Sequence, residues 1–215
     1  MLSVHIEKQL THFALDIQFD IGKEIAVLYG PSGSGKTTIL HTIAGLVKPQ
    51  SGFIKLRDRI LFQDKTFNVP VPKRNIGYVF QQYALFPHMT VWENIQYGMK
   101  SESLAKNMMK ELHIDHLLHQ YPHEVSGGER QRTALIRALA TEPELLLLDE
   151  PFSALDDETK EISYEQLIAL HKKWEIPIIL VTHNQHDVEK LANKILNIEA
   201  GKIFNRKEIK QIQTN

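Results

Sequence analysis

The sequence has no cysteine among its 215 residues, which excludes a disulfide scaffold and a thiolate-bound metal or redox centre. It also has no run of about 18 apolar residues, the length needed to span a bilayer. Its first ten residues, MLSVHIEKQL, lack the basic and apolar regions of a signal peptide. We therefore expect a protein of a reducing, cytoplasmic compartment.

Excess charge of either sign is absent too. The chain has 25 Lys and Arg against 26 Asp and Glu, a formal net charge of -1 at pH 7. A dedicated nucleic-acid binder carries a basic excess, so we expect no nucleic-acid partner. Hydrophobic residues make up 42% of the chain, which is enough for one substantial core at this length.

Two kinds of hydrophobic pattern predict an α/β fold. Apolar residues alternate over residues 3–19, which predicts two antiparallel strands. Continuous apolar runs at 25–29, 145–148 and 178–181 predict buried parallel strands. Helical spacing replaces these patterns over residues 83–141. We expect a mainly parallel sheet flanked by helices, with an N-terminal antiparallel β part and an inserted helical subdomain.

These patterns also predict the organisation of the chain. We expect a single domain over residues 1–215, with its core formed by residues 1–82 and 142–205 and its helical subdomain by residues 83–141. A hairpin around residues 195–203 closes the core, and a polar tail, 206–215, has too few apolar residues to fold alone. No C-terminal regulatory domain is expected.

A glycine-rich segment follows the first buried strand and precedes a predicted helix. It fits G-x-x-x-x-G-K-[ST] with Gly30, Pro31, Ser32, Gly33, Ser34, Gly35, Lys36 and Thr37. Backbone N–H groups of such a loop converge on phosphates, Lys36 reaches the terminal phosphates and the Thr37 hydroxyl can ligate Mg²⁺. Thr38 offers a further hydroxyl. Both flanks are of the required type, which disfavours a chance surface turn and predicts a nucleoside triphosphate ligand.

Polar residues end the other two buried strands. Asp149 and Glu150 follow the run at 145–148, where we expect Asp149 to hold Mg²⁺ through water and Glu150 to polarise the attacking water as the general base. The alternative is a simple cap on the next turn. His183 follows the run at 178–181, and we expect it to contact the γ-phosphate, although a lone histidine is more often structural.

Taken in order along the chain, these motifs resemble those of the nucleotide-binding subunits of ATP-binding cassette (ABC) transporters. The likeness covers essentially the whole chain and includes three further motifs: Gln81; Ser126, Gly127, Gly128 and Glu129; and Ser153, Ala154, Leu155 and Asp156. The resemblance implies that ATP and Mg²⁺ are bound and ATP is hydrolysed. It also implies the P-loop NTPase fold.

The resemblance assigns a role to each of these motifs. It implies that Gln81, rather than its neighbour Gln82, ligates Mg²⁺ and senses a membrane partner. Residues 126–129 would be the signature motif, which contacts the γ-phosphate bound to the other subunit. Residues 153–156 would be the D-loop, which links the two active sites of a dimer.

The signature segment departs from the family's usual Leu-Ser-Gly-Gly-Gln at Val125 and Glu129. Independently of the family, Ser126 and Glu129 have the spacing of a capping box that starts a helix. We therefore expect Glu129 to point back into this box and orient the loop rather than bind ATP.

The resemblance further implies an assembly. It is a head-to-tail homodimer with ATP at the interface, docked through residues 81–92 on integral-membrane permease subunits at the cytoplasmic face of the membrane. A periplasmic or lipid-anchored solute-binding protein would supply the cargo indirectly. The short N-terminal hairpin, Glu129 and residues 75–81 are most similar to molybdate-importer ATPases. The alternatives are importers of sulfate, iron, a polyamine or a sugar.

Three other interpretations are less favoured. A soluble ABC ATPase working on DNA or the ribosome usually has a coiled-coil insertion or two cassettes, and neither is present. A small-molecule kinase would leave residues 126–129 unexplained. His113, His116, His119 and His123 have helical spacing, but a metal-binding face is disfavoured because Asp115 is expected to cap a new helix between them.

The family usually stacks adenine on an aromatic residue of the N-terminal hairpin, and no residue here fits that role clearly. Phe13 alternates with Leu15 and Ile17, so we expect Phe13 to lie in the core.

Overall fold

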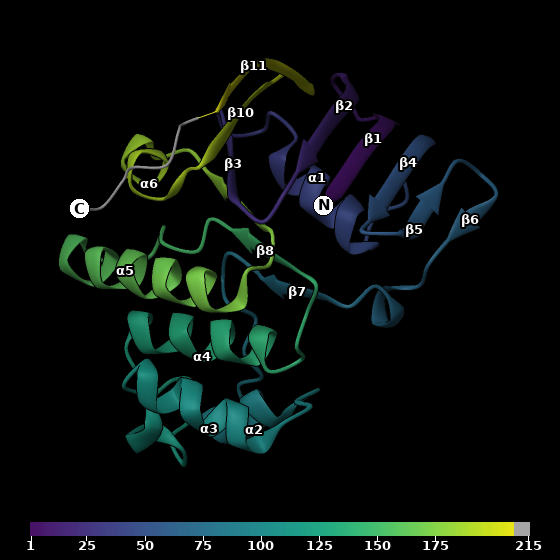
Figure 1. Ribbon diagram of the computed structural model, residues 1–215. Coiled ribbons are helices and arrows are strands. Elements are labelled where there is room, and N and C mark those ends of the chain that lie inside the picture. The colour runs from purple at the N-terminus through teal and green to yellow at the C-terminus, as the bar shows by residue number, and fades with distance from the viewer. Residues whose placement is uncertain (209–215) are drawn as a thin grey trace.

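The computed structural model describes the backbone of residues 1–208 and the side chains of residues 1–204. Over this part of the chain, eleven strands form one sheet in the order β6-β5-β4-β1-β2-β11-β10-β3-β9-β8-β7 (Figure 1). The strands are β1 (Leu2–Gln9), β2 (Ala14–Ile21), β3 (Ile25–Tyr29), β4 (Ser51–Leu56), β5 (Arg59–Gln63), β6 (Phe67–Asn68), β7 (Ile76–Val79), β8 (Leu145–Asp149), β9 (Ile178–Thr182), β10 (Lys194–Glu199) and β11 (Lys202–Glu208).

Helices connect and cover these strands. They are α1 (Lys36–Ala44), α2 (Val91–Gln96), α3 (Glu102–Glu111), α4 (Gly127–Leu139), α5 (Asp157–Trp174), α6 (Gln185–Leu191) and the 3₁₀ turns η1 (Val71–Lys73) and η2 (Asp115–Leu117). Among the described helices, none combines the length and the apolar character that a bilayer span requires.

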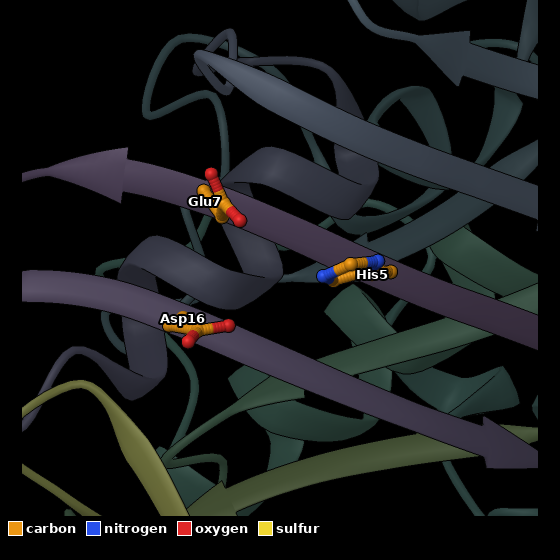
Figure 2. A group of neighbouring side chains, drawn as sticks. All are labelled: His5, Glu7 and Asp16. Carbon is orange, nitrogen blue, oxygen red and sulfur yellow. The ribbon is translucent and has the colours of Figure 1, made fainter.

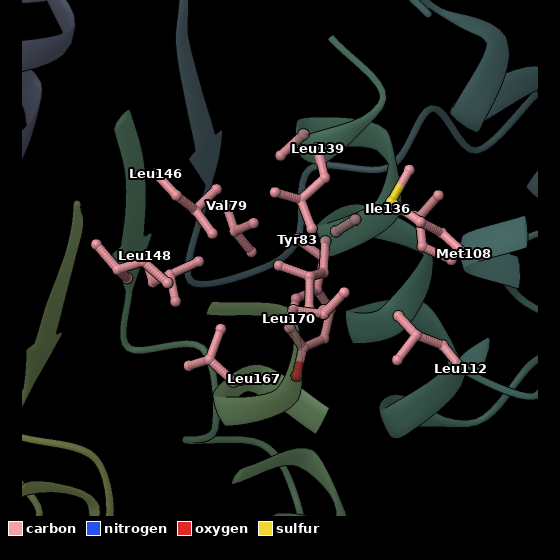
Figure 3. Close-up of a cluster of buried hydrophobic side chains, with 14 of the residues drawn as sticks. Val79, Tyr83, Met108, Leu112, Ile136, Leu139, Leu146, Leu148, Leu167 and Leu170 are labelled. Carbon is pink, nitrogen blue, oxygen red and sulfur yellow. The ribbon is translucent and has the colours of Figure 1, made fainter. Parts of the chain in front are cut away.

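The parallel strands β3, β7, β8 and β9 have apolar side chains on both faces. In β8, Leu145 and Leu147 pack in the same cluster as α1, whereas Leu146 and Leu148 pack with α4 and α5 on the opposite side (Figure 3). Each of these leucines is at most 2% exposed, and full burial of such a side chain stabilises the fold by about 1.5–3 kcal/mol. Two-sided burial explains why these strands are continuous apolar runs, and it confirms the predicted buried parallel strands.

The antiparallel part of the sheet, formed by β1, β2, β4, β5 and β6, lies on the side of α1 away from β7 and β8 (Figure 1). β1 pairs with β2 and β4, and the burial of β2 alternates strictly, with Leu15, Ile17 and Phe19 inward. These side chains share one cluster with Ile39 and Ile43 of α1. The predicted antiparallel strands are therefore present.

The helices α2, α3, η2 and α4 lie between β7 and β8 along the chain. Met108 and Leu112, from α3 and its end, pack on Ile136 and Leu139 of α4 (Figure 3). A break does occur between the predicted histidine-bearing helices, but the cap of η2 is Ile114 rather than Asp115, which is its first residue. α3 ends at Glu111, and the left-handed φ of 55° at His113 lies between it and η2.

The C-terminal hairpin is longer than predicted. β11 pairs antiparallel with β10 as far as the pair Lys194 and Glu208, so the strand extends into the segment expected to be a polar tail from residue 206. Backbone hydrogen bonds to β10 hold these residues and require no apolar side chains, which is why composition missed them. Residues 209–215 of the predicted tail lie outside the described residues.

Arg74 joins α1 to the loop before β7 and is only 1% exposed. Its guanidinium donates to the carbonyls of Thr42 and Ile43 at the end of α1, at 3.1 and 2.6 Å, and also to Val69 O and Asn68 Oδ1. A Cβ added to Gly45 would lie 2.6 Å from its Nε. Burial lowers the pKa of Arg74 to about 10, so the side chain is charged at neutral pH and caps the helix.

We expect Arg74→Met to lower the free energy of unfolding by about 3 kcal/mol, because acceptors at the end of α1 and in the loop before β7 lose a charged hydrogen-bond donor. Urea denaturation measures this change. The control is Arg57→Met, which removes an arginine with a 55% exposed side chain paired with Glu144 and should cost less than about 1 kcal/mol. Equal losses in the two variants would contradict the capping role.

Candidate functional site

The predicted phosphate loop connects β3 to α1. Gly30 approaches β10 so closely that an added Cβ would lie 2.0 Å from Ile198 O, so no other residue fits there. Gly35 is the N-cap of α1 with φ 101° and gives no side-chain cap. The first N–H groups of α1 therefore have no side-chain acceptor at the cap and lie beside a cleft lined by Ser32, Gly33 and Gly35.

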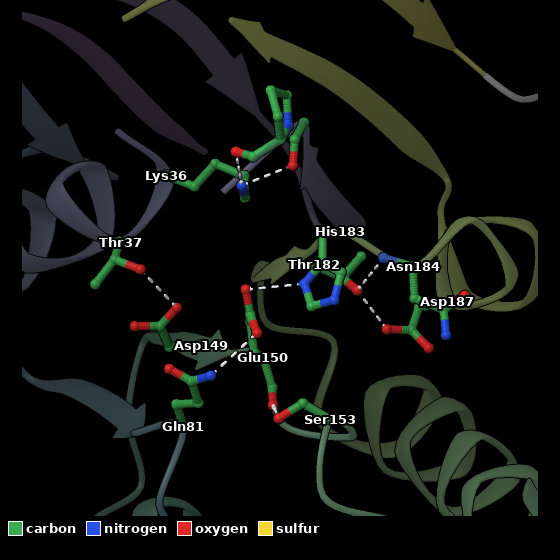
Figure 4. Close-up of polar contacts among 12 residues, drawn as sticks. Lys36, Thr37, Gln81, Asp149, Glu150, Ser153, Thr182, His183, Asn184 and Asp187 are labelled. Carbon is green, nitrogen blue, oxygen red and sulfur yellow. Dashed lines mark hydrogen bonds and ion pairs between the residues drawn. The ribbon is translucent and has the colours of Figure 1, made fainter. Parts of the chain in front are cut away.

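Lys36 lies within this loop and is 5% exposed. Its Nζ donates to Gly30 O and Pro31 O, both at 2.7 Å (Figure 4). Burial lowers the pKa of Lys36, while the charges of Glu150 and Asp149 oppose this shift. The loop thus fixes one ammonium group beside two carboxylates at the base of the cleft.

Asp149 ends β8 and is 5% exposed. It accepts hydrogen bonds from Thr37 Oγ1 at 3.1 Å and from Tyr78 Oη at 3.3 Å. Burial raises its pKa, and the two hydrogen bonds only partly offset the effect. Because both donors are neutral hydroxyls, the carboxylate would gain from a cation. The Thr37 hydroxyl and the Asp149 carboxylate are oxygen ligands of the type Mg²⁺ prefers, so these two residues fit that ion.

Glu150 follows Asp149 in a left-handed conformation with φ 45°. Its N–H donates to Val181 O at 3.0 Å, and its carbonyl accepts from Ser153 Oγ at 2.9 Å. The carboxylate accepts from Gln81 Nε2 at 3.1 Å and lies 3.1 Å from His183 Nδ1 (Figure 4). Backbone strain of this kind persists where the surroundings impose it, and it concentrates at functional sites.

The structure therefore brings together six of the predicted residues. Lys36 and Thr37 begin α1 after the loop that follows β3. Gln81 follows β7, Asp149 ends β8, Glu150 comes next, and His183 follows β9. Because these strands are parallel, their carboxyl ends lie at one edge of the sheet, the usual place for a ligand in such folds.

The cleft beside this edge is also lined by the turn between β1 and β2. Its lining there comprises Gln9, Leu10, Thr11, His12 and Phe13. The prediction that Phe13 lies in the core is wrong: β2 begins only at Ala14, so Phe13 is in the turn and half-buried. An added Cβ on Gly35 would lie 3.4 Å from the Phe13 ring, so this ring packs beside the phosphate loop.

The signature segment lies elsewhere, and the cleft lining does not include it. The predicted capping box is present, with Ser126 Oγ accepting from Glu129 N and Glu129 Oε2 accepting from Ser126 N. Burial raises the pKa of Glu129, but the Ser126 hydrogen bonds and nearby positive charges outweigh it and lower the pKa. Glu129 thus points back into its own helix, as expected.

Residues 153–156 lie between these two regions. Ser153 bonds to the Glu150 backbone, and an added Cβ on Gly127 would lie 3.6 Å from Leu155 and 3.7 Å from Ala154 O. Asp156 caps α5 by accepting from Thr159 N at 2.9 Å. The segment is therefore a structural bridge from the Glu150 loop to the start of α4.

Sequence reasoning missed Tyr78. A polar hydroxyl at an inward position of β7, three residues before Gln81, was the available signal, since a buried phenol needs an acceptor.

His5, Glu7 and Asp16 form the one group of three clustered metal-type ligands found among the described residues (Figure 2). They lie on β1 and β2, and Glu7 already accepts from Ser51 Oγ at 2.7 Å. Both carboxylates are exposed, and exposed acidic groups of this kind do not by themselves indicate a bound ion. The four histidines at positions 113, 116, 119 and 123 form no such group within the residues described.

Comparison with known proteins decides the family. A model described as ABC transporter matches residues 15–153, more than half of the chain. The chain belongs to the ABC transporter family.

Two curated members of the ABC transporter family illustrate the likeness. The molybdenum import ATP-binding protein ModC of Pasteurella multocida is 44% identical over 97% of this chain, which spans 61% of that relative's length. The molybdate/tungstate import ATP-binding protein WtpC of Archaeoglobus fulgidus is 40% identical over 98% of this chain and 88% of its own length.

Solved structures of the ABC transporter family confirm the P-loop ATPase fold. CbiO1 from Clostridium perfringens, part of the complex cbiONQ, superposes with a TM-score of 0.85 at 26% identity, covering 96% of this chain and 88% of its own. A dimeric ATP-binding cassette in a post-hydrolysis state, bound to ADP and Pi, superposes with a TM-score of 0.82 at 25% identity, covering 99% of this chain and all of its own.

The buried charge of Asp149 generates a stability prediction. We expect Asp149→Asn to raise the melting temperature of the ligand-free protein at pH 7 by about 2–4 °C, because the folded state disfavours the charged form of this acid. Differential scanning fluorimetry measures the shift. Asp157→Asn, at an exposed side chain 3.7 Å from Lys160 Nζ, is the control and should change the melting temperature by less than about 2 °C. A lower melting temperature for Asp149→Asn would contradict the argument.

Proposed function

We propose that this chain is the ATP-hydrolysing subunit of an importer and acts at the cytoplasmic face of a membrane. One observation carries the proposal: Gln81, Glu150 and His183 meet within hydrogen-bond distance above the loop that holds Lys36. A carboxylate held between an amide and an imidazole beside an anion-binding loop is suited to activating water against a phosphate.

In this proposal the phosphates of ATP occupy the loop of residues 30–35 and the N-terminus of α1. Backbone N–H groups bind the phosphate oxygens, Lys36 neutralises their charge, and Thr38 adds a hydroxyl. Thr37, Asp149 and Gln81 would hold Mg²⁺, which when bound offsets charge on the phosphate oxygens. Phe13 lines the cleft beyond the loop and offers a ring face to the base.

Hydrolysis then depends on Glu150 and His183. The Glu150 carboxylate orients and polarises a water whose oxygen attacks the γ-phosphorus, and it takes up the proton released. The bond from the γ-phosphorus to the bridging oxygen breaks, and ADP and phosphate leave. His183 stabilises the γ-phosphoryl oxygens, and Gln81 holds Glu150 in position.

A second copy of the chain would complete the site. The segment of Ser126, Gly127, Gly128 and Glu129 presents the N-terminus of the 13-residue α4 away from the cleft of its own chain. Such a terminus favours an anion. A head-to-tail pair would place it on the γ-phosphate in the partner's cleft, and a dimeric cassette of the same fold supports this arrangement.

The permease would dock near residues 81–92. Tyr83 and Ala84 adopt left-handed backbone conformations there, and Arg137 of α4 donates to both of their carbonyls at 2.8 Å. Tyr83 is buried at 5% exposure, whereas Phe86 and Trp92 are partly exposed, so the surface is narrower than the sequence indicated. Arg137 would transmit movement of this surface to the signature helix.

We infer that the cargo is molybdate or a similar oxyanion. The support is the similarity over nearly the whole chain to relatives named for molybdate import. Importers of sulfate, iron, polyamines or sugars remain the alternative cargo classes. A permease and a solute-binding protein would select the cargo, since in this proposal the cleft binds nucleotide.

We expect Glu150→Gln to bind ATP normally and to lose turnover by about 10²–10⁴-fold, because the amide cannot accept the water's proton. The variant should also accumulate as a dimer with Mg-ATP. Phosphate release and size-exclusion chromatography measure the two effects. Glu199→Gln, at the exposed end of β10, is the matched control. Full activity in Glu150→Gln would remove Glu150 from the role of base.

We expect Lys36→Ala to weaken ATP binding by at least about tenfold, the effect of losing one charged hydrogen bond to phosphate. Equilibrium binding of a fluorescent ATP analogue measures it. Lys48→Ala, near the far end of α1, should bind normally. Retained tight binding in Lys36→Ala would contradict the loop assignment.

The importer itself is tested by capture. Tagged Glu150→Gln with Mg-ATP, added to detergent-solubilised native membranes, should co-purify a polytopic permease identified by mass spectrometry. The associated solute-binding protein should bind molybdate in preference to sulfate. Recovery of ribosomal or DNA-bound partners without a permease would instead identify a soluble ATPase.

A further inference from the structure

A buried carboxylate next to the site has no part in the chemistry proposed above. Asp187 of α6 is 4% exposed. Its Oδ1 accepts from the hydroxyl of Tyr164 in α5, and its Oδ2 accepts from the hydroxyl of Thr182 at the end of β9. Both donors are at most 2% exposed. A fully satisfied polar network of this kind rigidifies its surroundings.

The Thr182 end of this network holds the two residues that flank His183 in the chain (Figure 4). The Thr182 hydroxyl, which donates to Asp187, also accepts from the N–H of Asn184 at 3.0 Å. The residues immediately before and after His183 are therefore tied to one hydroxyl. The side chain of His183 is itself 54% exposed and meets Glu150 at one ring nitrogen. Its direction consequently depends on how firmly its backbone is held.

The Tyr164 end of the network contacts the loop that follows Glu150. The Tyr164 ring packs edge-on against Phe152, with centroids 4.9 Å apart and an interplanar angle of 79°. Phe152 lies two residues after the strained Glu150. Burial raises the pKa of Tyr164, and the neighbouring Asp187 raises it further, so its hydroxyl stays protonated and donates at neutral pH.

We propose that Tyr164 and Asp187 are positioning residues that set the His183 loop against the Glu150 loop, so that turnover depends on a hydroxyl that does not touch nucleotide. This inference rests on the proposed ATPase function. Neither residue lines the cleft. Of the groups proposed to bind ATP or Mg²⁺, the network holds only His183; the others lie on the β1–β2 turn, the phosphate loop and α1, or are Gln81 and Asp149. The network therefore acts on the rate of hydrolysis and not on affinity for ATP.

The first test is Tyr164→Phe, which keeps the ring on Phe152 and removes only the hydroxyl. We expect kcat to fall about tenfold while KM and the affinity for a fluorescent ATP analogue stay within about twofold. Tyr121→Phe makes the same change at a 39% exposed residue and should leave both constants unchanged. An unaltered kcat in folded Tyr164→Phe, or a raised KM with normal kcat, would overturn the proposal.

A double-mutant comparison separates positioning from a general loss of structure. His183→Ala should lower kcat by about 10²-fold in the wild-type background but by only about tenfold in Tyr164→Phe, because His183 is already misplaced there. Independent structural damage would give equal factors in both backgrounds and would contradict the inference. Asp187→Asn should show the same reduced dependence on His183.

Failure of the proposed ATPase function and failure of the positioning role would give different results. A wild-type chain that hydrolyses no ATP, alone or with its captured permease, would refute the ATPase itself. A wild type inactivated by Glu150→Gln but insensitive to Tyr164→Phe would refute only the positioning role.

Discussion

Burial of both faces of the parallel strands is the constraint on which the rest of the structure depends. Leu145 and Leu147 pack toward α1 while Leu146 and Leu148 pack toward α4 and α5, so a slip of β8 by one residue would bring Glu144 or Asp149, the acids that flank the run, into an apolar position. This register fixes where the strand ends and so where Asp149 and Glu150 lie. The neighbouring strands are held in the same way. Because they run parallel, the polar residues that follow them lie together at one edge of the sheet.

The site places negative charge where the fold would otherwise exclude it. Asp149 and Asp187 are both nearly buried, and each is partnered by two hydroxyls rather than by a cation. Hydroxyl donors hold a carboxylate in place without cancelling its charge. In Asp149 the remaining charge is available to an ion, whereas in Asp187 it is used to align two loops. The same chemistry thus serves binding in one position and geometry in the other.

Local pattern predicted what local pattern controls. The parallel strands, the capping box of Ser126 and the positions of Glu150 and His183 just after buried strands all follow from apolar runs and from local spacing; the contact between Glu150 and His183 does not. Phe13 failed because alternation does not reveal where a strand begins, and Tyr78, Arg74 and Tyr164 were missed because their partners are distant in sequence. Residues 206–208 join β11 through backbone bonds, which composition does not report.

The close packing of Arg74 against Gly45 has an evolutionary consequence. The guanidinium fills the space that any side chain at position 45 would need. It also donates hydrogen bonds to the backbone carbonyls of Thr42 and Ile43 at the end of α1. Neither position can change alone without either a clash or unsatisfied carbonyls. The two should therefore covary among descendants of this sequence. Because Gly45 has a left-handed φ of 87°, the side chain that arises at position 45 should be asparagine, which tolerates this conformation, together with a shorter residue at position 74 and a different cap for the helix.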